Sequence, residues 1–167
     1  MKSRNSQSTT PSAETASTPP IKEGSFWRYV SNSPAETFEI GEQIGDSLKG
    51  DELILLTGGL GAGKTLLTKG ILNALDFDID EVTSPSFALV NLYHAKFDVY
   101  HIDLWRIDKG DAAAAVGLDE ILENREAIVI VEWAERLTRD QDVASLRVMI
   151  EGDGDEPRKI RWKGEQT

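Results

Sequence analysis

Two short segments of the chain are apolar at nearly every position: residues 52–57 (ELILLT) and residues 127–133 (AIVIVEW). Continuous apolar runs of this length are typical of strands that are buried on both faces of a sheet. Residues 25–32 (SFWRYVSN) have the composition of a further short strand. The pattern therefore predicts a sheet with helices packed on it.

Helix signals lie between these runs. In residues 33–50, Ser33 is a candidate N-cap, Pro34 suits the first helical position and Glu36 completes a capping box. Gly50 fits the position after the end of this helix. A second helix is expected after residue 63, and its apolar face would carry Leu67, Ile71, Ala74 and Leu75.

Antiparallel pairs are predicted at two places. Residues 84–107 hold two strand-like runs separated by the short sequence HAK, which is the spacing of a hairpin. Residues 145–152 and 158–164 follow as a second pair, joined by an acidic turn. Residues 111–122 are helical in composition, with a break near Gly117. Together these elements predict the α/β class, with a mixed parallel and antiparallel sheet and flanking helices.

Composition divides the chain into two parts. Residues 1–24 are rich in Ser, Thr and Pro and have almost no large apolar side chains. Burial cannot offset the entropy of ordering such a segment, so we expect a disordered tail. A transit peptide is the weaker interpretation, because Arg4 is the only arginine there and no amphipathic stripe is visible. One domain is expected over residues 25–164.

Charge and cysteine content narrow the classes of function. The 167 residues carry a formal net charge of −11, whereas nucleic-acid-binding proteins present basic surface to phosphates. Any connection with nucleic acid is therefore expected to run through a partner. The chain has no cysteine, which excludes disulfides and thiolate metal sites. No apolar run has the length of a membrane span or of a secretory signal core, so we expect a cytoplasmic protein that does not contact membranes.

A glycine-rich segment, TGGLGAGKTLLTKG, follows the first apolar run. Gly58, Gly63, Lys64 and Thr65 match the phosphate-binding motif G-x-x-x-x-G-K-[ST]. Glycines let backbone N–H groups converge on phosphates, and the following helix points its positive end at them. Lys64 should reach the β- and γ-phosphates, and the Thr65 hydroxyl should ligate Mg²⁺. Because a strand precedes the loop and a helix follows it, we predict a single P-loop NTPase-like domain.

Two acidic residues stand at the ends of apolar strands. Glu132 follows AIVIV and Asp103 follows VYHI. Ligands bind at the carboxyl ends of strands in open α/β sheets, so both acids are candidates for the site. Glu132 follows the more apolar run, and we assign it to the metal, directly or through water. Asp103 is then the candidate for positioning or activating the attacking water. For each acid the alternative is a solvated strand end.

Residues near the predicted site are less clear in their role. Residues 83–87 (TSPSF) fall where a switch-like segment that senses the γ-phosphate would lie, but a polar loop entering a strand fits equally well. Trp133 packs either beside the site or in the core. His94 and His101 flank the hairpin, and we assign neither a catalytic nor a metal role, since histidines in sheets are more often structural.

Five motifs occur in a fixed order and at close spacing: GGLGAGKT, TSPSFALV, YHIDLWR, VGLDEIL and IVIVEW. In this combination the chain resembles the TsaE family (also called YjeE), the small P-loop ATPases of bacterial tRNA threonylcarbamoyladenosine modification. The resemblance covers about residues 31–162. It is specific because H-x-D-L-x-R followed by V-E-W is far less widespread than the P-loop. It implies an ATPase, weak alone, that acts on the threonylcarbamoyl transferase pair TsaD and TsaB and meets tRNA only through that complex.

The resemblance also implies roles for individual residues. It places Mg²⁺ on Thr65 and Glu132, hydrolysis on Asp103 with the help of the P-loop lysine, and Ser84 in the switch-like loop. Trp133 matches the family's functional tryptophan. The residues implied to contact ATP are Pro34, Leu60, Gly61, Ala62, Gly63, Lys64, Thr65 and Arg158, with Pro34 near the base.

Three positions depart from the family pattern. Trp105 replaces a tyrosine, Leu66 stands where a second hydroxyl often follows Lys-Thr, and Ala134 replaces a common proline. None of the three is a phosphate or metal ligand, so these departures bear on rate and on partner fit rather than on activity.

Two other functions were weighed against an ATPase. Small-molecule kinases of this fold usually carry an arginine-bearing lid, whereas the segment after DLWRID is short and rich in alanine. A guanine-nucleotide switch usually needs an N-K-x-D-type segment and a D-x-x-G motif, and the sequence has neither. The kinase remains the main alternative.

Overall fold

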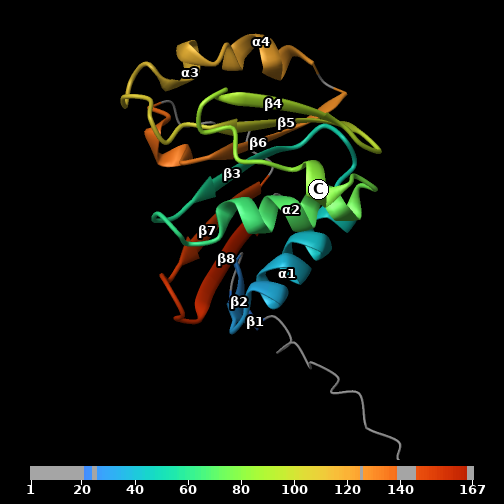
Figure 1. Cartoon of the computed structure of the whole chain (residues 1–167), viewed down its shortest axis with the longest axis vertical. Coiled ribbons are helices and arrows are strands. Elements are labelled where there is room, and N and C mark those ends of the chain that lie inside the picture. Colours follow the sequence, from blue (N-terminus) through green and yellow to red (C-terminus); the bar gives the residue numbers. More distant parts are fainter. Residues whose placement is uncertain (1–20, 24–25, 125, 139–145, 165–167) are drawn as a thin grey trace, which may run out of the picture.

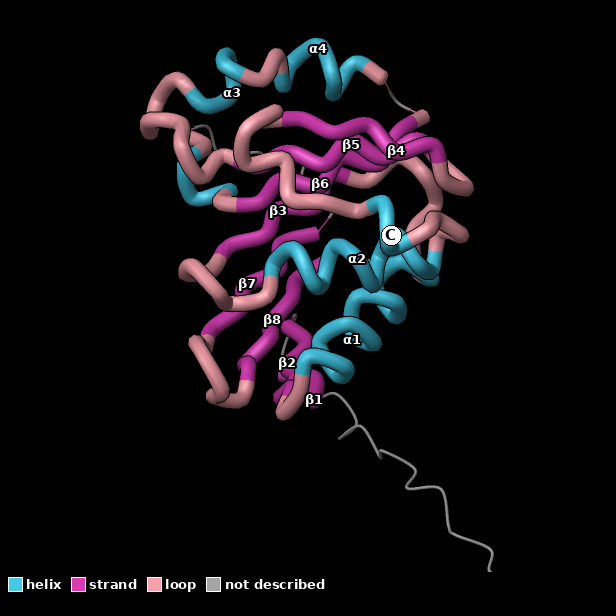
Figure 2. The backbone as a smooth tube through the Cα atoms, viewed as in Figure 1, coloured by secondary structure: helices cyan, strands magenta, loops and turns pink. Residues whose placement is uncertain are grey.

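The structure is a computed structural model that describes residues 21–23, 26–124, 126–138 and 146–164. The strands are β1 (Ile21–Glu23), β2 (Phe26–Ser31), β3 (Leu53–Thr57), β4 (Val90–His94), β5 (Asp98–Asp103), β6 (Ala127–Glu132), β7 (Leu146–Glu151) and β8 (Arg158–Gly164). The helices are α1 (Pro34–Asp46), α2 (Lys64–Ala74), α3 (Ala112–Ala115) and α4 (Leu118–Glu123), with short 3₁₀ turns η1 (Ile79–Glu81) and η2 (Ala134–Arg136). Figures 1 and 2 show their arrangement around one sheet.

The sheet is parallel at its centre and antiparallel at its margins. Its strand order is β1-β2-β8-β7-β3-β6-β5-β4. Strands β7, β3, β6 and β5 run parallel to one another. Strand β4 pairs antiparallel with β5, and β8, β2 and β1 continue the sheet from β7 in antiparallel pairs. The predicted α/β fold with a mixed sheet is confirmed, and both predicted hairpins form. Because parallel strands end at one edge, the ends of β3, β5 and β6 lie together.

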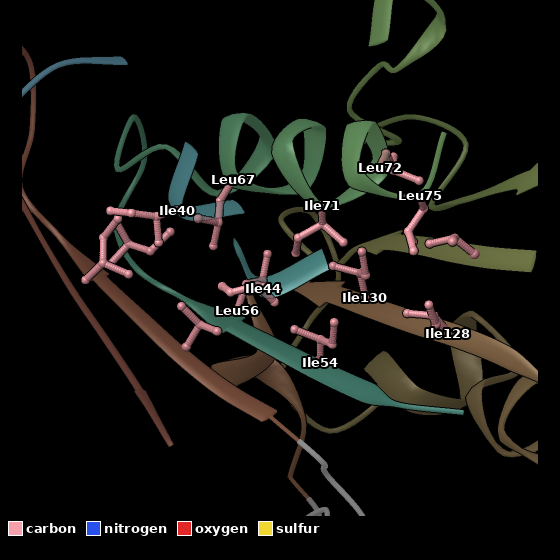
Figure 3. Close-up of a cluster of buried hydrophobic side chains, with 14 of the residues drawn as sticks. Ile40, Ile44, Ile54, Leu56, Leu67, Ile71, Leu72, Leu75, Ile128 and Ile130 are labelled. Carbon is pink, nitrogen blue, oxygen red and sulfur yellow. The ribbon is translucent and has the colours of Figure 1, made fainter. Parts of the chain in front are cut away.

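The central strands are buried on both faces, which explains their continuous apolar sequences. In β3, Ile54 and Leu56 belong to the core cluster under α1 and α2, which Figure 3 shows. Leu53 and Leu55 belong to the second cluster, which includes residues of α3 and α4. The alternation of side chains along a strand thus separates the two cores.

The beginning of α1 is close to the expected capping box. The Ser33 hydroxyl accepts the N–H of Glu36 at 3.2 Å, as an N-cap does. The Glu36 carboxylate accepts the N–H of Asn32 at 2.7 Å, one residue before the N-cap. Glu36 therefore bonds the backbone of Asn32 where a capping box would have it bond the backbone of Ser33. Pro34 takes the first helical position as expected.

The end of α1 differs from the prediction. The helix stops at Asp46, with Ser47 as its C-cap, and the Ser47 hydroxyl donates to the carbonyl of Ile44 at 2.7 Å. Gly50 lies in the following loop at φ +115°, where a Cβ would be 2.6 Å from the Phe97 ring. The glycine is required by that loop and not by the helix end.

Helices α1 and α2 pack with their backbones in contact, and Figure 1 shows them side by side. A Cβ on Gly41 would lie 2.3 Å from the carbonyl oxygen of Leu67, and one on Gly70 would lie 2.1 Å from that of Phe38. On the predicted apolar face of α2, Leu67 and Ile71 are buried, as is Leu75 just beyond the helix, while Ala74 is half-buried. This packing fixes α2, and with it the loop that precedes the helix.

The boundary of the predicted tail needs correction. Residues Ile21–Glu23 were expected within a disordered segment, but they form β1, which pairs antiparallel with β2 through Ile21 and Arg28. The remainder of that segment, residues 1–20 and 24, lies outside the described residues. The predicted break at Gly117 is confirmed, because this residue separates α3 from α4 at φ +62°. Among the described residues, no helix is both long and apolar enough to cross a membrane.

Candidate nucleotide-binding site

The phosphate loop connects β3 to α2. Gly63 is the N-cap of α2 and adopts φ +104°, a conformation that favours glycine. Because glycine has no side chain with which to cap the helix, the first N–H groups of α2 stay available to an anion. Gly58 also has a positive φ, and a Cβ there would lie 2.4 Å from the carbonyl oxygen of Ile150. The loop thus has the backbone geometry of a phosphate cradle.

Lys64 lies inside this loop. Its Nζ donates to the carbonyls of Gly58 and Gly59, both at 2.7 Å, and lies 3.9 Å from the centre of the Trp133 ring. Burial lowers the pKa of Lys64, while the nearby carboxylate of Glu132 opposes this effect by favouring the charged form. The lysine is therefore held where phosphate oxygens would replace the two carbonyls as its partners.

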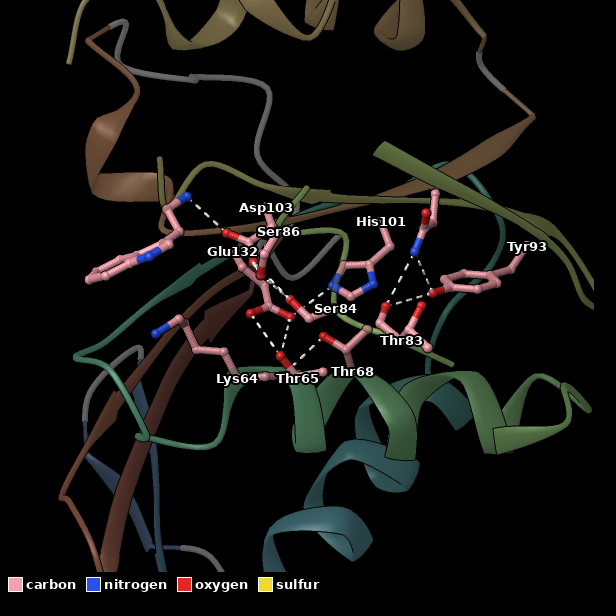
Figure 4. Close-up of polar contacts among 12 residues, drawn as sticks. Lys64, Thr65, Thr68, Thr83, Ser84, Ser86, Tyr93, His101, Asp103 and Glu132 are labelled. Atoms are coloured by element: carbon pink, nitrogen blue, oxygen red, sulfur yellow. Dashed lines mark hydrogen bonds and ion pairs between the residues drawn. The ribbon is translucent and has the colours of Figure 1, made fainter. Parts of the chain in front are cut away.

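Glu132, at the end of β6, is bonded from two elements. The Thr65 hydroxyl, in the first turn of α2, donates to Oε1 at 3.0 Å and to Oε2 at 3.1 Å. His101 in β5 contributes Nε2 at 2.7 Å from Oε1. The carboxylate is only 2% exposed and the histidine is fully buried. Figure 4 shows Thr65 and His101 meeting Glu132 from different sides.

Asp103 lies beside Glu132, because the two are register partners in the parallel pair of β5 and β6. Its Oδ2 accepts hydrogen bonds from the hydroxyls of Ser84 and Ser86, both at 2.9 Å. Its Oδ1 accepts the N–H of Trp105 at 2.8 Å. The predicted switch-like segment therefore reaches the second acid directly.

Aromatic side chains flank the lysine. Trp133 adopts φ +59° and its ring lies 4.4 Å from that of Trp105, centre to centre. Trp133 also packs against the second core cluster. Trp133 thus contacts both Lys64 and the second core cluster. The guanidinium carbon of Arg136 lies 5.9 Å from the centre of the Trp105 ring and 6.0 Å from the centre of the Trp133 ring.

Arg158, the first residue of β8, ties the C-terminal hairpin to the phosphate loop. Its Nε donates to the carbonyl of Ala62 at 3.0 Å, and its Nη2 donates to those of Gly61 at 3.2 Å and Gly154 at 2.8 Å. Leu60, at the outer side of the loop, is 70% exposed. The sequence-predicted loop residues and Arg158 are thus gathered in one place.

The first turn of α1 also approaches the loop. A Cβ built on Gly63 would lie 3.6 Å from Cγ2 of Thr37. Thr37 is one turn after Pro34, which opens α1. The first turn of α1 therefore lies beside the loop that leads into α2 and that Arg158 of β8 contacts.

Two residues of this network were not predicted as functional. Ser86 shares Asp103 with Ser84, and His101 bonds Glu132. A signal for the histidine was present, because His101 stands two residues before Asp103 in one strand, and such residues face the same side of a sheet. If Asp103 faces α2, His101 must do so as well.

Oxygen donors at the start of α2 are suited to magnesium. Mg²⁺ is usually held by one or two carboxylates together with substrate phosphates and water. The Thr65 hydroxyl and the Glu132 carboxylate supply such oxygens within 3.1 Å of each other. Among the described residues, this site included, no group of three or more His, Cys, Asp or Glu is placed to hold a metal ion by itself. The residues present therefore fit a cation shared with a nucleotide.

The fold and this loop define the class of protein: a P-loop-type domain with its phosphate cradle at the carboxyl edge of a mainly parallel sheet. Comparison with known proteins then gives the family. The family model described as threonylcarbamoyl adenosine biosynthesis protein TsaE matches residues 31–160. The chain belongs to the TsaE family, which takes part in the biosynthesis of tRNA threonylcarbamoyladenosine. The resemblance seen in the sequence is confirmed.

Individual relatives agree with this assignment. The chain is 39% identical over 134 residues to the tRNA threonylcarbamoyladenosine biosynthesis protein TsaE of Aquifex aeolicus, covering 79% of this chain and 92% of the relative. It is 32% identical over 130 residues to that of Treponema pallidum, covering 75% and 95%. The crystal structure of YdiB from Bacillus subtilis superimposes with a TM-score of 0.63 at 28% identity, covering 83% of this chain and 85% of YdiB.

Proposed function

We propose that this protein binds ATP with Mg²⁺ and hydrolyses it to support tRNA threonylcarbamoyladenosine modification, by acting on the TsaD–TsaB transferase complex. The observation that carries the proposal is the contact of Thr65 with Glu132 beside the phosphate loop, with Asp103 one strand away. Family membership supports the pathway, and the site supports the chemistry.

The loop would bind the triphosphate. Backbone N–H groups of Leu60 to Thr65 and the N-terminus of α2 would surround the β-phosphate, and Lys64 would exchange its two carbonyl partners for β- and γ-phosphate oxygens. Arg158 would stabilise the loop and reach the nucleotide from β8. Pro34 would lie toward the base, at the start of α1.

Thr65 and Glu132 would hold the magnesium ion, which when bound neutralises charge on the phosphates. The hydroxyl would turn its lone pairs to the cation, and the carboxylate would face it directly or through water. The Trp133 ring, 3.9 Å from Nζ, would help to keep Lys64 in place. These roles require no movement of the sheet.

Asp103 would act on water. In hydrolysis a bond forms between the water oxygen and the γ-phosphorus, the bond to the bridging oxygen breaks, and ADP leaves. Asp103 would orient that water and accept its proton. In this structure Ser84 and Ser86 already donate to Oδ2, so the two hydroxyls compete with water. This competition supports an ATPase that is slow alone and faster when a partner rearranges the segment.

The charge of the chain supports an indirect role toward tRNA. A protein with net charge −11 is repelled by a phosphate backbone. Contact with tRNA would therefore pass through the TsaD–TsaB complex, and we place this activity in the cytoplasm.

The test is an ATPase assay of the protein alone and with a TsaD–TsaB pair from the same organism. Strong stimulation by the pair supports the proposal, and phosphate transfer to a small molecule would instead establish a kinase. Lys64→Met should lower ATP affinity about 10- to 100-fold, which is the net loss of about one hydrogen bond to a charged group, about 1.5–3 kcal/mol. Lys69→Met on the same helix is the matched control.

A further inference from the structure

A second buried polar residue, His101, shares the carboxylate that the proposed function assigns to magnesium. Its side chain is fully buried, and Nε2 lies 2.7 Å from Oε1 of Glu132. Neighbouring positions with the same strand orientation, such as Val99 in β5 and Ile130 opposite His101 in β6, are apolar core residues. An apolar side chain would suit the packing at position 101 better, because burying a polar ring costs free energy. Core packing alone therefore does not explain the histidine.

The hydrogen bond to Glu132 shows which nitrogen of the His101 ring is the donor. A carboxylate can only accept, so Nε2 must donate to Glu132. Nδ1 is buried and has no hydrogen-bond partner among the described residues. The Nε2–H group makes His101 a hydrogen-bond donor to Glu132.

The ring is also held in place by its neighbours. The Tyr93 ring lies 6.1 Å from that of His101, centre to centre, and the Tyr93 hydroxyl donates to the carbonyl of Thr83 at 3.0 Å. The backbone of His101 is paired with Asn91 on one side and Ile130 on the other. The strand pairing therefore sets the position from which His101 donates to Oε1, while Thr65 contacts both oxygens of the same carboxylate.

We propose that His101 is a positioning residue for the magnesium site: its Nε2–H holds Oε1 of Glu132 and leaves Oε2 to meet the cation beside Thr65. The inference rests on the proposed function, because it assigns a role toward that site. Partners of this kind around a metal ligand typically change metal affinity about 10- to 100-fold when they are removed.

The first experiment compares His101→Leu, which removes the donor, with His101→Gln, whose amide N–H₂ can reach a similar place. Binding of a non-hydrolysable ATP analogue is measured by calorimetry over a magnesium titration, and again in EDTA. We expect His101→Leu to raise the half-saturating magnesium concentration about 10- to 100-fold, with little change in affinity in EDTA. His101→Gln should restore most of the magnesium response.

His94 supplies the matched control. It lies in the same hairpin, bonds the exposed carboxylate of Asp98 at 2.8 Å and is largely exposed. His94→Leu should leave the magnesium titration unchanged. Thermal unfolding of all four variants, including His94→Gln, separates the proposed role from a purely structural one, which would lower the melting temperature without changing the magnesium response of the folded protein.

The second experiment reads the ring directly in the unmodified protein. The chain has two histidines, so ¹⁵N spectra of the imidazole nitrogens are assigned with the help of His94→Gln. We expect His101 to show a protonated Nε2, before and after addition of magnesium and the ATP analogue. An Nε2 without a proton would overturn the inference even if His101→Leu does not fold.

The outcomes distinguish the two proposals. If the wild-type protein binds the analogue with a magnesium requirement and His101→Leu has the same requirement, the inference is wrong and the proposed function stands. If the wild-type protein shows no magnesium-dependent binding, both are wrong. A raised requirement in His101→Leu that His101→Gln reverses supports the inference.

Discussion

Replacing Asp103 by Asn separates hydrolysis from structure. The carboxylate accepts hydrogen bonds from Ser84, Ser86 and the N–H of Trp105. An asparagine can keep the Trp105 contact with its carbonyl oxygen and donate from its amide to the two hydroxyls, which accept as well as donate. The free energy of unfolding should fall by only about 1–2 kcal/mol, as charged hydrogen bonds become neutral ones. Asp103→Ala would instead leave these groups without their acceptor.

The effect on catalysis should be far larger than the effect on stability. An amide cannot take a proton from water, and the loss of a general base typically lowers the rate about 10²- to 10⁴-fold. That corresponds to about 2.7–5.5 kcal/mol in the barrier. ATP affinity should stay close to that of the wild type, because the described contacts of Asp103 are with the 84–86 segment and Trp105 and not with the phosphate loop.

The assay is single-turnover hydrolysis of ATP with a saturating TsaD–TsaB pair, with nucleotide affinity measured separately by calorimetry. Asp98→Asn, at the other end of β5, is the control, since its carboxylate bonds the exposed His94. Wild-type turnover by Asp103→Asn would refute the reasoning and leave Asp103 with a structural role only. A parallel loss of ATP affinity would show that the residue belongs to the binding site instead.

Three further changes test the loop, the metal acid and the core. Glu132→Gln should weaken the magnesium dependence of ATP binding, and an unaltered magnesium titration would count against its role. Gly58→Ala should destabilise the fold by about 1–3 kcal/mol in urea unfolding, because its Cβ would meet the carbonyl of Ile150, whereas Gly59→Ala, with no atom within 4 Å, should change little. Ile71→Ala, at a fully buried position of α2, should cost about 2–5 kcal/mol in the same measurement.

Features set by neighbouring residues were predictable from the sequence. The phosphate loop, the two apolar strands and both hairpins depend on local composition and spacing, and the structure contains all of them. The predicted end of α1 at Gly50 is wrong, because the helix stops at Asp46. The helix instead ends where the Ser47 hydroxyl bonds back to Ile44, and serine is less distinctive than glycine as an end signal.

Features set by long-range pairing were not predictable in the same way. Strand β1 forms because β2 offers it an edge, although its own composition indicated a tail. The contact between His101 and Glu132 joins residues 31 positions apart. It depends on the register of β5 against β6, which the sequence does not state. The two acids were correctly placed together because both end parallel strands.

Some glycines of this chain are required by helix packing and others by ligand binding, and selection experiments should distinguish the two. Gly41 and Gly70 are fixed by the backbone of the opposing helix, so any surviving variant must keep them, with or without a nucleotide to bind. Gly59 has no protein atom near its missing Cβ, so only a ligand can constrain it. In a library selected for folding alone, position 59 should therefore accept substitutions, whereas positions 41 and 70 should remain glycine. A second library, selected for growth, would show whether substitutions at position 59 are lost when function is required. That comparison would reveal a constraint from ligand binding without purification of the protein.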